Sequence, residues 1–314
     1  MRYDVAAIGF YTLDILGRPV DAIPPGGGVA FVDEIRLVVS GTAGATAVDL
    51  AKLGMRCLAA GAVGSDEQGR FVLDKLRRHG VDVSAMQRIE GVPTSTTIMN
   101  VRSNGERPAL HMRGASDHFL TQEAAYPQLL DASFIHLGGT GFLRAMDGEP
   151  SVRLLKAAKE AGCTTTFDLI APGDDGQALV EPLLPFIDYF MPSIEEAHAL
   201  SGHADPAEAG KWFVDKGVRV AAITMGAEGS VVVDADGRVL RLPAFEVTVS
   251  DTTGCGDAYV AGMICATARG MDLETAARFA SAAAALVATG LGSDAGIVGF
   301  EETLKAMQTL PCRR

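Results

Sequence analysis

Short apolar runs rich in β-branched residues alternate along this chain with longer stretches of helical periodicity, and this alternation constrains the fold most. Buried parallel strands are apolar on both faces and are joined by helices, so the pattern predicts an α/β fold with a mostly parallel sheet. Glycines at 54, 80 and 162 follow three of the helical stretches, as helix C-terminal caps do. The strand-like runs are 5–9, 58–63, 134–137, 164–168, 188–191 and 220–224, and the helical stretches include 44–53, 67–78, 151–161 and 194–200.

A second kind of strand pattern occupies 31–39, 95–101 and 109–113. Polar and apolar residues alternate there, which is typical of strands with one solvated face. Asn104-Gly105 joins the last two segments and predicts a tight hairpin. We therefore expect a small β-sheet, inserted at about 12–40 and 94–114, on a single domain that spans 1–314. A further hairpin is predicted over 230–242, followed by helices over 255–270 and 273–289.

Acidic residues outnumber basic ones in this chain of 314 residues, and the net charge is −12. Such a surface repels nucleic acid and anionic membranes, so neither is expected as a partner. The longest apolar tract, 280–291, is too short to span a bilayer. Five scattered cysteines form no C-x-x-C pair, which favours reduced thiols and a cytoplasmic protein over a disulfide framework or a zinc site.

The segment D-T-T-G-C-G-D at 251–257 is the strongest chemical signal. Glycines at 254 and 256 leave backbone N–H groups bare where a helix begins, and such an end binds anions. Asp257 in the same turn could accept a proton from an attacking hydroxyl while the N–H groups stabilise the transferred phosphoryl group. Taken alone, the turn is also compatible with Asp257 as a simple helix cap.

The same segment resembles the D-T-x-G-A-G-D signature of the ribokinase-like (PfkB) carbohydrate kinase family, with Cys255 where alanine is usual. Other landmarks of that family follow in order along essentially the whole chain. They are G-x4-D at 9–14, a Gly-rich segment at 40–44, V-G-x-D at 63–66, G-V-D at 80–82, a variant of P-N-x-x-E at 192–196 and T-x-G-x-x-G at 224–229. The resemblance implies a three-layer α-β-α sandwich with a β-sheet lid, and ATP-dependent phosphorylation of a hydroxymethyl group on a small sugar-like acceptor.

The resemblance also implies roles for individual residues. Asp257 would be the general base, with the backbone of Gly254, Cys255 and Gly256 as the anion hole. Glu196 would orient water around Mg²⁺. The residues implied for the acceptor are Asp14, Gly41, Thr42, Ala45 and Gly138, and those for ATP are Ser193, Thr224, Gly226, Gly229 and Ser281; Asp251, Thr253 and Gly292 would form an optional site for a monovalent cation such as K⁺.

Departures from the family pattern concern the acceptor. Ala45 stands where an asparagine usually contacts the sugar in the family, and Gly138 stands where ribose kinases share a glutamate. The D-P-N-x-R run appears at 168–172 without its arginine, so a carboxylated acceptor is less expected through that contact. A site with fewer hydrogen-bonding groups suits ribose poorly and suits a bulkier or less hydroxylated ligand better.

Other function classes are weaker. A Rossmann dehydrogenase lacks its G-x-G-x-x-G, a P-loop ATPase lacks its G-x4-G-K-[ST], and the six histidines form no metal motif. An inactive sugar-sensing protein would be expected to lose the base or the anion hole, and both are intact. Within the family, a nucleoside kinase stays the alternative, although Phe10, Tyr11 and Phe31 are weak evidence for base stacking. The lid further suggests a homodimer, as in many family members.

Overall fold

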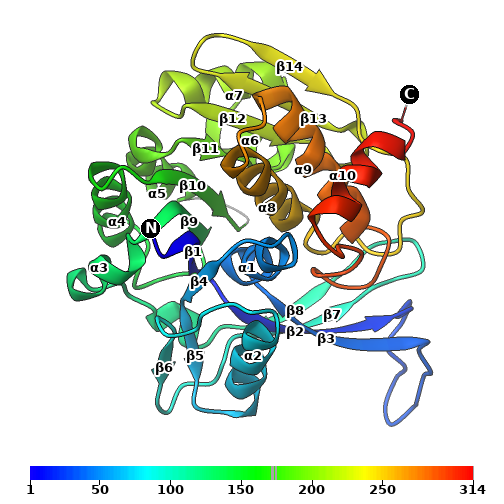
Figure 1. Cartoon of the computed structure of the whole chain (residues 1–314). Coiled ribbons are helices and arrows are strands. Elements are labelled where there is room, and N and C mark those ends of the chain that lie inside the picture. Colours follow the sequence, from blue (N-terminus) through cyan, green and yellow to red (C-terminus); the bar gives the residue numbers. More distant parts are fainter. Residues whose placement is uncertain (171–172, 174, 314) are drawn as a thin grey trace.

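The computed structural model describes residues 1–170, 173 and 175–313 (Figure 1). Within these residues a central sheet holds eight strands. Their order is β14 (Val239–Leu242), β13 (Ser230–Asp234), β12 (Val220–Thr224), β11 (Tyr189–Phe190), β10 (Thr164–Leu169), β9 (Ala132–Thr140), β1 (Tyr3–Gly9) and β4 (Cys57–Ala60). The strands from β12 to β4 pair in parallel, and β13 and β14 add an antiparallel edge. The predicted mostly parallel sheet is confirmed.

Helices cover both faces of this sheet, which confirms the three-layer arrangement (Figure 1). Because successive side chains of a strand point to opposite faces, Val5 and Ala7 of β1 enter one core and Ala6 and Ile8 the other. The first core is covered by α1 (Thr42–Lys52), α2 (Glu67–Arg78), α8 (Cys255–Ala268), α9 (Leu273–Val287) and α10 (Phe300–Thr309). The second is covered by α3 (Tyr126–Leu129), α4 (Glu149–Glu160), α5 (Gly176–Val180), α6 (Ile194–Ser201) and α7 (Pro206–Asp215).

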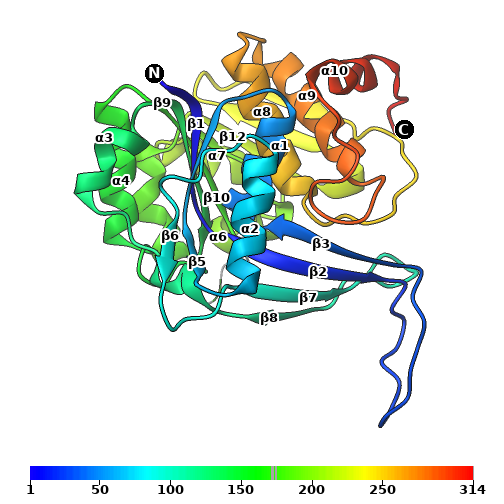
Figure 2. The same cartoon turned by 60° about the horizontal axis from the view of Figure 1, so that its bottom comes forward.

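A second sheet extends away from the first, and the chain between its first two strands projects beyond it (Figure 2). Its order is β3 (Glu34–Ser40), β2 (Thr12–Arg18), β7 (Thr96–Asn100) and β8 (Ala109–Met112). The pairing of β2 with β7 is parallel, and the other two pairings are antiparallel. This sheet, called the lid sheet below, confirms the predicted small sheet. The hairpin at Asn104-Gly105 is also present, with Gly105 at a φ of +87°.

Several predicted strands differ in extent from the observed ones: β9 is longer at both ends than 134–137, and β11 is shorter than 188–191. The run 58–63 is divided between β4 and the short strand β5 (Ala62–Gly64), which pairs with β6 (Gln87–Ile89) in a separate small sheet. Gly61 lies at the break because the Tyr11 ring packs against its backbone. The strand predicted from 31 begins only at Glu34, and Phe31 is 95% exposed on the projecting segment. Helix α7 was not predicted, although Asp205 caps it and Pro206 opens it.

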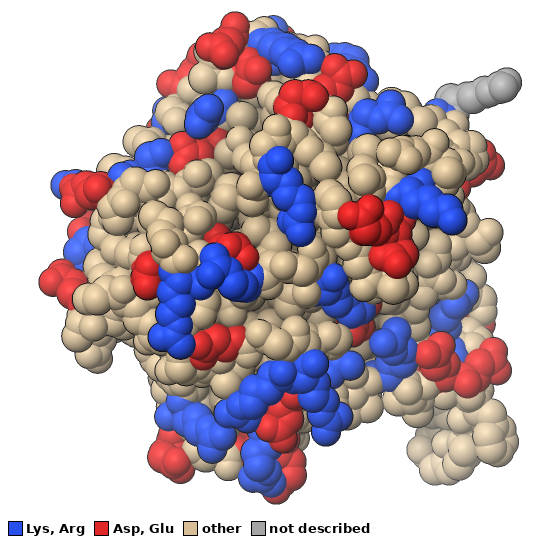
Figure 3. Space-filling model, in the orientation of Figure 1, with Lys and Arg blue, Asp and Glu red and all other residues tan. Residues whose placement is uncertain are grey.

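Charged side chains of both signs are interspersed on the face shown in Figure 3, and basic ones gather over its lower part, where Figure 1 places α2. The last turn of that helix carries Lys75, Arg77 and Arg78. Among the helices of the described residues, none is both long enough and apolar enough to cross a membrane.

Replacing Gly61 with alanine tests the packing at the break between β4 and β5. An added Cβ would lie 2.3 Å from Cδ2 of Tyr11 and 2.7 Å from the Gly9 carbonyl oxygen, and both are held in the core. We expect Gly61→Ala to lower the free energy of unfolding by about 2–4 kcal/mol, measured by urea denaturation. Gly80→Ala is the control, because its φ is +80° but nothing lies within 4 Å of the new Cβ. A loss at Gly61 no larger than at Gly80 would contradict the packing argument.

Candidate active site

A cavity of about 960 Å³ lies where the carboxyl ends of the parallel strands face the lid sheet. The chain lines it at the ends of β1, β10, β11 and β12 or directly after them, for example at Phe10, Asp168 and Thr224. The lid sheet contributes residues of β2, β7 and β8, and helix α8 contributes its first turn. In open α/β sheets this edge is where ligands bind.

The turn 251–257 opens helix α8 against the cavity. Gly254 is the N-cap and takes a left-handed φ of +80°, and a Cβ there would lie 2.4 Å from Cα of Ser293. The N–H of Cys255 donates to the Thr252 carbonyl at 3.3 Å. Within the described part of the chain no acceptor pairs with the N–H groups of Gly254, Gly256 or Asp257. Three amides at the positive end of a helix dipole therefore remain available to an anion.

Two carboxylates in the cavity, Asp14 and Asp257, each keep a buried Oδ1 without a hydrogen-bond partner among the described residues. Burial and, to a smaller extent, the negative charge of Asp14 together raise the pKa of Asp257 to about 7, although the positive charge of Arg107 acts against both. Burial also raises the pKa of Asp14 to about 6, against the hydroxyls of Ser40 and Thr97. A carboxylate with a pKa near 7 is well matched to proton abstraction at neutral pH.

Asp168, at the end of β10, is a third carboxylate in this cavity. Its Oδ1 accepts the N–H of Leu169 at 2.8 Å, and burial raises its pKa well above the usual range, with Glu196 and Asp257 adding to the effect. Sequence reasoning used this residue only to note a missing arginine, although an aspartate closing a buried strand was a usable signal. Residues 171 and 172 of that run lie outside the described residues.

Every residue implied for ATP lines the same cavity. Ser193 and Glu196 form a capping box at the start of α6, in which Glu196 Oε2 accepts the Ser193 N–H at 2.8 Å. Gly229 has a φ of +94°, and a Cβ there would lie 2.0 Å from the Leu242 carbonyl oxygen, so only glycine fits. No group of three or more His, Cys, Asp or Glu within 1–170, 173 and 175–313 could hold a metal ion by itself.

On the acceptor side, Gly41 and Thr42 line the cavity, whereas Ala45 and Gly138 are not among the lining residues. Ala45 is fully buried within α1. A Cβ at Gly138 would lie 2.8 Å from both the Ala43 nitrogen and Nε2 of His136, which leaves no room for a longer side chain.

Three aromatic rings form part of the cavity wall, and sequence reasoning recognised only one of them. Phe10, His111 and Phe142 pack with ring centroids 5.4 to 5.7 Å apart. Nδ1 of His111 lies 3.1 Å from Thr97 Oγ1, and its buried Nε2 has no partner among the described residues. Of the other two aromatics, Tyr11 is buried with its hydroxyl bonded to the Ala7 carbonyl, and Phe31 lies on the projecting segment.

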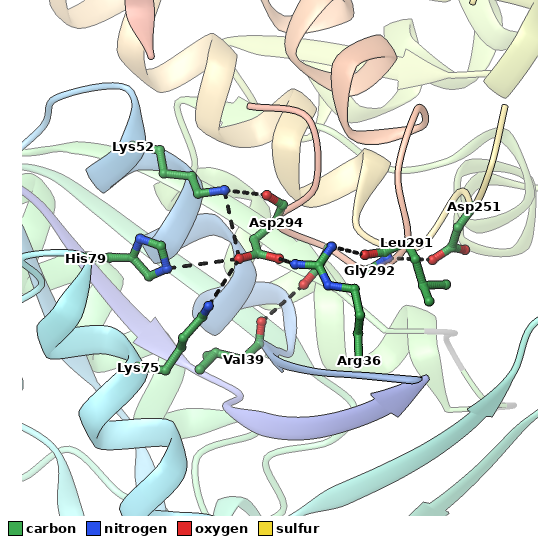
Figure 4. A network of polar contacts seen from close by, with 10 residues as sticks. Arg36, Val39, Lys52, Lys75, His79, Asp251, Leu291, Gly292 and Asp294 are labelled. Atoms are coloured by element: carbon green, nitrogen blue, oxygen red, sulfur yellow. Dashed lines mark hydrogen bonds and ion pairs between the residues drawn. The ribbon is translucent and has the colours of Figure 1, made fainter. Parts of the chain in front are cut away.

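The candidate cation site joins the anion hole to a loop that precedes α10. Asp251 Oδ1 accepts from the N–H and hydroxyl of Thr253 at 3.0 and 2.8 Å, and Oδ2 accepts from the Gly292 N–H at 2.9 Å. Two residues after Gly292, Asp294 is 4% exposed and lies among four basic side chains, as Figure 4 shows. These are Arg36 of β3, Lys52 of α1, and Lys75 and His79 of α2.

Comparison with known proteins shows the family to which the chain belongs. The model of the pfkB family carbohydrate kinases matches residues 4–298. The chain belongs to this family. A nucleoside kinase of Methanothermobacter thermautotrophicus is 27% identical to it over 96% of this chain and 94% of its own.

Solved structures share its fold. A ribokinase of Arabidopsis thaliana complexed with ribose and ATP has a TM-score of 0.82 and 22% identity, covering 98% of this chain and 99% of its own. An E. coli protein in complex with ATP and Mg²⁺ has a TM-score of 0.84 and 21% identity, over 98% and 99% of the two chains. The predicted family, its carbohydrate kinase class and the fold class are thus confirmed.

Replacing Asp294 with asparagine tests the role of the loop in this pfkB kinase. The change keeps the volume but leaves Arg36, Lys52 and Lys75 without their shared carboxylate, so we expect a loss of about 2–3 kcal/mol of unfolding free energy. Chemical denaturation measures it. Asp74→Asn is the control, because its ion pair with Arg77 is exposed and should contribute less than about 1 kcal/mol. Equal losses for the two variants would refute a central role for Asp294.

Proposed function

We propose that Asp257 accepts the proton of an acceptor hydroxymethyl group while the amides of Gly254, Cys255 and Gly256 stabilise the phosphoryl group in transfer. One observation carries the proposal. A single turn combines a carboxylate whose buried Oδ1 has no partner among the described residues with amides of a helix start that have no acceptor among them. The Cys255 amide would join when its long bond to Thr252 yields to a stronger anionic acceptor. An inactive sensor would be expected to have lost the base or to have a filled anion hole, and neither is found within the described residues.

ATP and Mg²⁺ are proposed as co-substrate and cofactor, since a similar fold was solved with both. Ser193, Thr224, Gly226, Gly229 and Ser281 would contact the nucleotide. Mg²⁺ usually keeps several waters and binds phosphate oxygens, so Glu196 would hold it through water. It would neutralise charge on the phosphates.

An optional monovalent cation such as K⁺ is proposed at Asp251, Thr253 and Gly292. Asp251 is 1% exposed and has no basic side chain at ion-pair distance among the described residues. A buried carboxylate without a counter-charge suits a hard cation, together with carbonyl oxygens of Thr253 and Gly292.

The acceptor is proposed to be a sugar-like molecule held by Asp14, Gly41 and Thr42, whose Oγ1 is a further buried atom without a partner among the described residues. Ala45 and Gly138 would affect the choice of acceptor only because they supply no side-chain hydrogen bond to it. The Phe10, His111 and Phe142 wall favours a second candidate, a nucleoside, because flat rings pack well against aromatic edges.

A kinase assay across pentoses, hexoses, sugar phosphates and nucleosides tests the proposal. Asp257→Asn should reduce kcat by about 10²–10⁴-fold, with ATP binding retained. Because the base must be ionised, kcat/KM should rise with pH through about 7 and then level off. Activity of Asp257→Asn within a few-fold of the wild type, or a flat profile between pH 5 and 8, would remove Asp257 from the mechanism. No turnover of any acceptor would overturn the kinase proposal itself.

The lid sheet is proposed to close over the acceptor and to pair two copies of the chain in a cytoplasmic homodimer. Closure would exclude water that competes with the acceptor hydroxyl. The outer lid face is apolar: Leu37, Ile15, Ile98 and Leu110 lie in register across all four strands. Its exposed members are Ile35, Leu37, Ile98, Leu110 and Met112. A continuous apolar face of this kind fits a second identical face related by a twofold axis.

Sedimentation should therefore detect a dimer at micromolar concentration. Leu37→Lys, in the middle of the outer lid face, should shift it to a monomer, because a charge would be buried without a partner. Val298→Lys is the control, since this residue is 72% exposed and lies outside the lid. A monomeric wild-type protein would refute the dimer.

A further inference from the structure

Arg107 lies on the lid hairpin, in a place that sequence reasoning did not consider. The hairpin is held on both sides of it, by hydrogen bonds from the Arg102 N–H to the Glu106 carbonyl at 2.8 Å and from the Asn100 N–H to the Pro108 carbonyl at 3.1 Å. The backbone of Arg107 is therefore fixed, although its residue is exposed. Its side chain lines the same cavity as Gly254 to Asp257.

Among the described residues, the guanidinium of Arg107 has no ion-pair partner, whereas two nearby arginines each have one. Arg102 pairs with Glu106, and Arg113 pairs with Asp117. Across the described residues no carboxylate lies at ion-pair distance from Arg107. A guanidinium with five donors and no partner is suited to a phosphate group.

Arg107 also acts on the anion hole at a distance. Burial raises the pKa of Cys255 to about 12, and the positive charge of Arg107 opposes this effect. The same arginine counteracts burial and Asp14 at Asp257. The guanidinium thus stands close enough to the first turn of α8 for its field to be felt by two residues of that turn.

We propose that Arg107 is a catalytic residue that contacts the transferred phosphoryl group when the lid closes. The proposal rests on the kinase function proposed above. The acceptor oxygen forms a bond to the γ-phosphorus as its proton passes to Asp257, and the bond from that phosphorus to the β,γ-bridging oxygen breaks, so that ADP leaves with the electron pair. Arg107 transfers nothing in this step. It supplies positive charge opposite the amides, where the equatorial oxygens carry charge in the transition state.

Steady-state kinetics of Arg107→Ala test the proposal. We expect kcat to fall by about 10²–10³-fold, with the KM values of ATP and acceptor changed less than about threefold. The acid limb of the kcat/KM profile should move to higher pH, because the base loses a neighbouring positive charge. Arg107→Lys should restore part of kcat, since it keeps the charge but not the fork. Arg102→Ala, on the same hairpin but outside the cavity lining, is the matched control and should resemble the wild type.

Two results would overturn the proposal. A raised acceptor KM with unchanged kcat would make Arg107 a residue that binds an anionic group of the acceptor, and unchanged kinetics would give it no role. Should the wild type turn over no acceptor, the kinase proposal fails by itself, and a binding measurement still decides on Arg107. MgADP with aluminium fluoride, which imitates the phosphoryl group in transfer, should then stabilise the wild type and the Arg102→Ala variant against heat more than it stabilises Arg107→Ala. Equal stabilisation would refute the contact.

Discussion

The close contact between Gly254 and Ser293 determines where helix α8 begins, and the site depends on it. A Cβ at position 254 would lie 2.4 Å from Cα of Ser293, so only glycine brings the two segments together at a φ of +80°. The contact turns the first amides of α8 toward the cavity. It also places Gly292 within reach of the Asp251 carboxylate, and thereby connects the anion hole to the loop that Asp294 holds among basic side chains (Figure 4).

Repulsion between buried carboxylates is the second feature of this site. Asp14, Asp168 and Asp257 all line one cavity, and burial raises the pKa of each. An anionic nucleotide would enter such a cavity against repulsion, in a chain whose net charge is already −12. Local hydrogen-bond donors can outweigh this repulsion, because unpaired amides at a helix start are preorganised and need little rearrangement when an anion binds. Protonation of the carboxyl groups at lower pH would relieve the repulsion but would remove the base.

In the lid sheet, side chains alternate between the two faces of each strand, and the two faces have different roles. Along β2 and β3, one set of side chains, which includes Leu16 and Val38, packs toward Leu291 beside the site. The alternate set, which includes Ile15 and Leu37, lies in register on the outer lid face. A shift of register by one residue would exchange the two sets, so the hydrophobic pattern and the hairpins together define which residues reach the acceptor.

Much of the fold was determined by local pattern: parallel strands by uninterrupted apolar runs, the lid hairpin by Asn104-Gly105, and the start of α8 by the glycines of 251–257. These features depend on backbone preference and burial, which a sequence expresses directly. The tertiary structure alone decided that Phe142, His111 and Arg107 meet at one cavity, and that Ala45 lies behind its wall. These residues carry no motif and come from separate loops and strands. They meet because the lid sheet packs on the main sheet. This long-range packing is not encoded in the local spacing of residues along the chain.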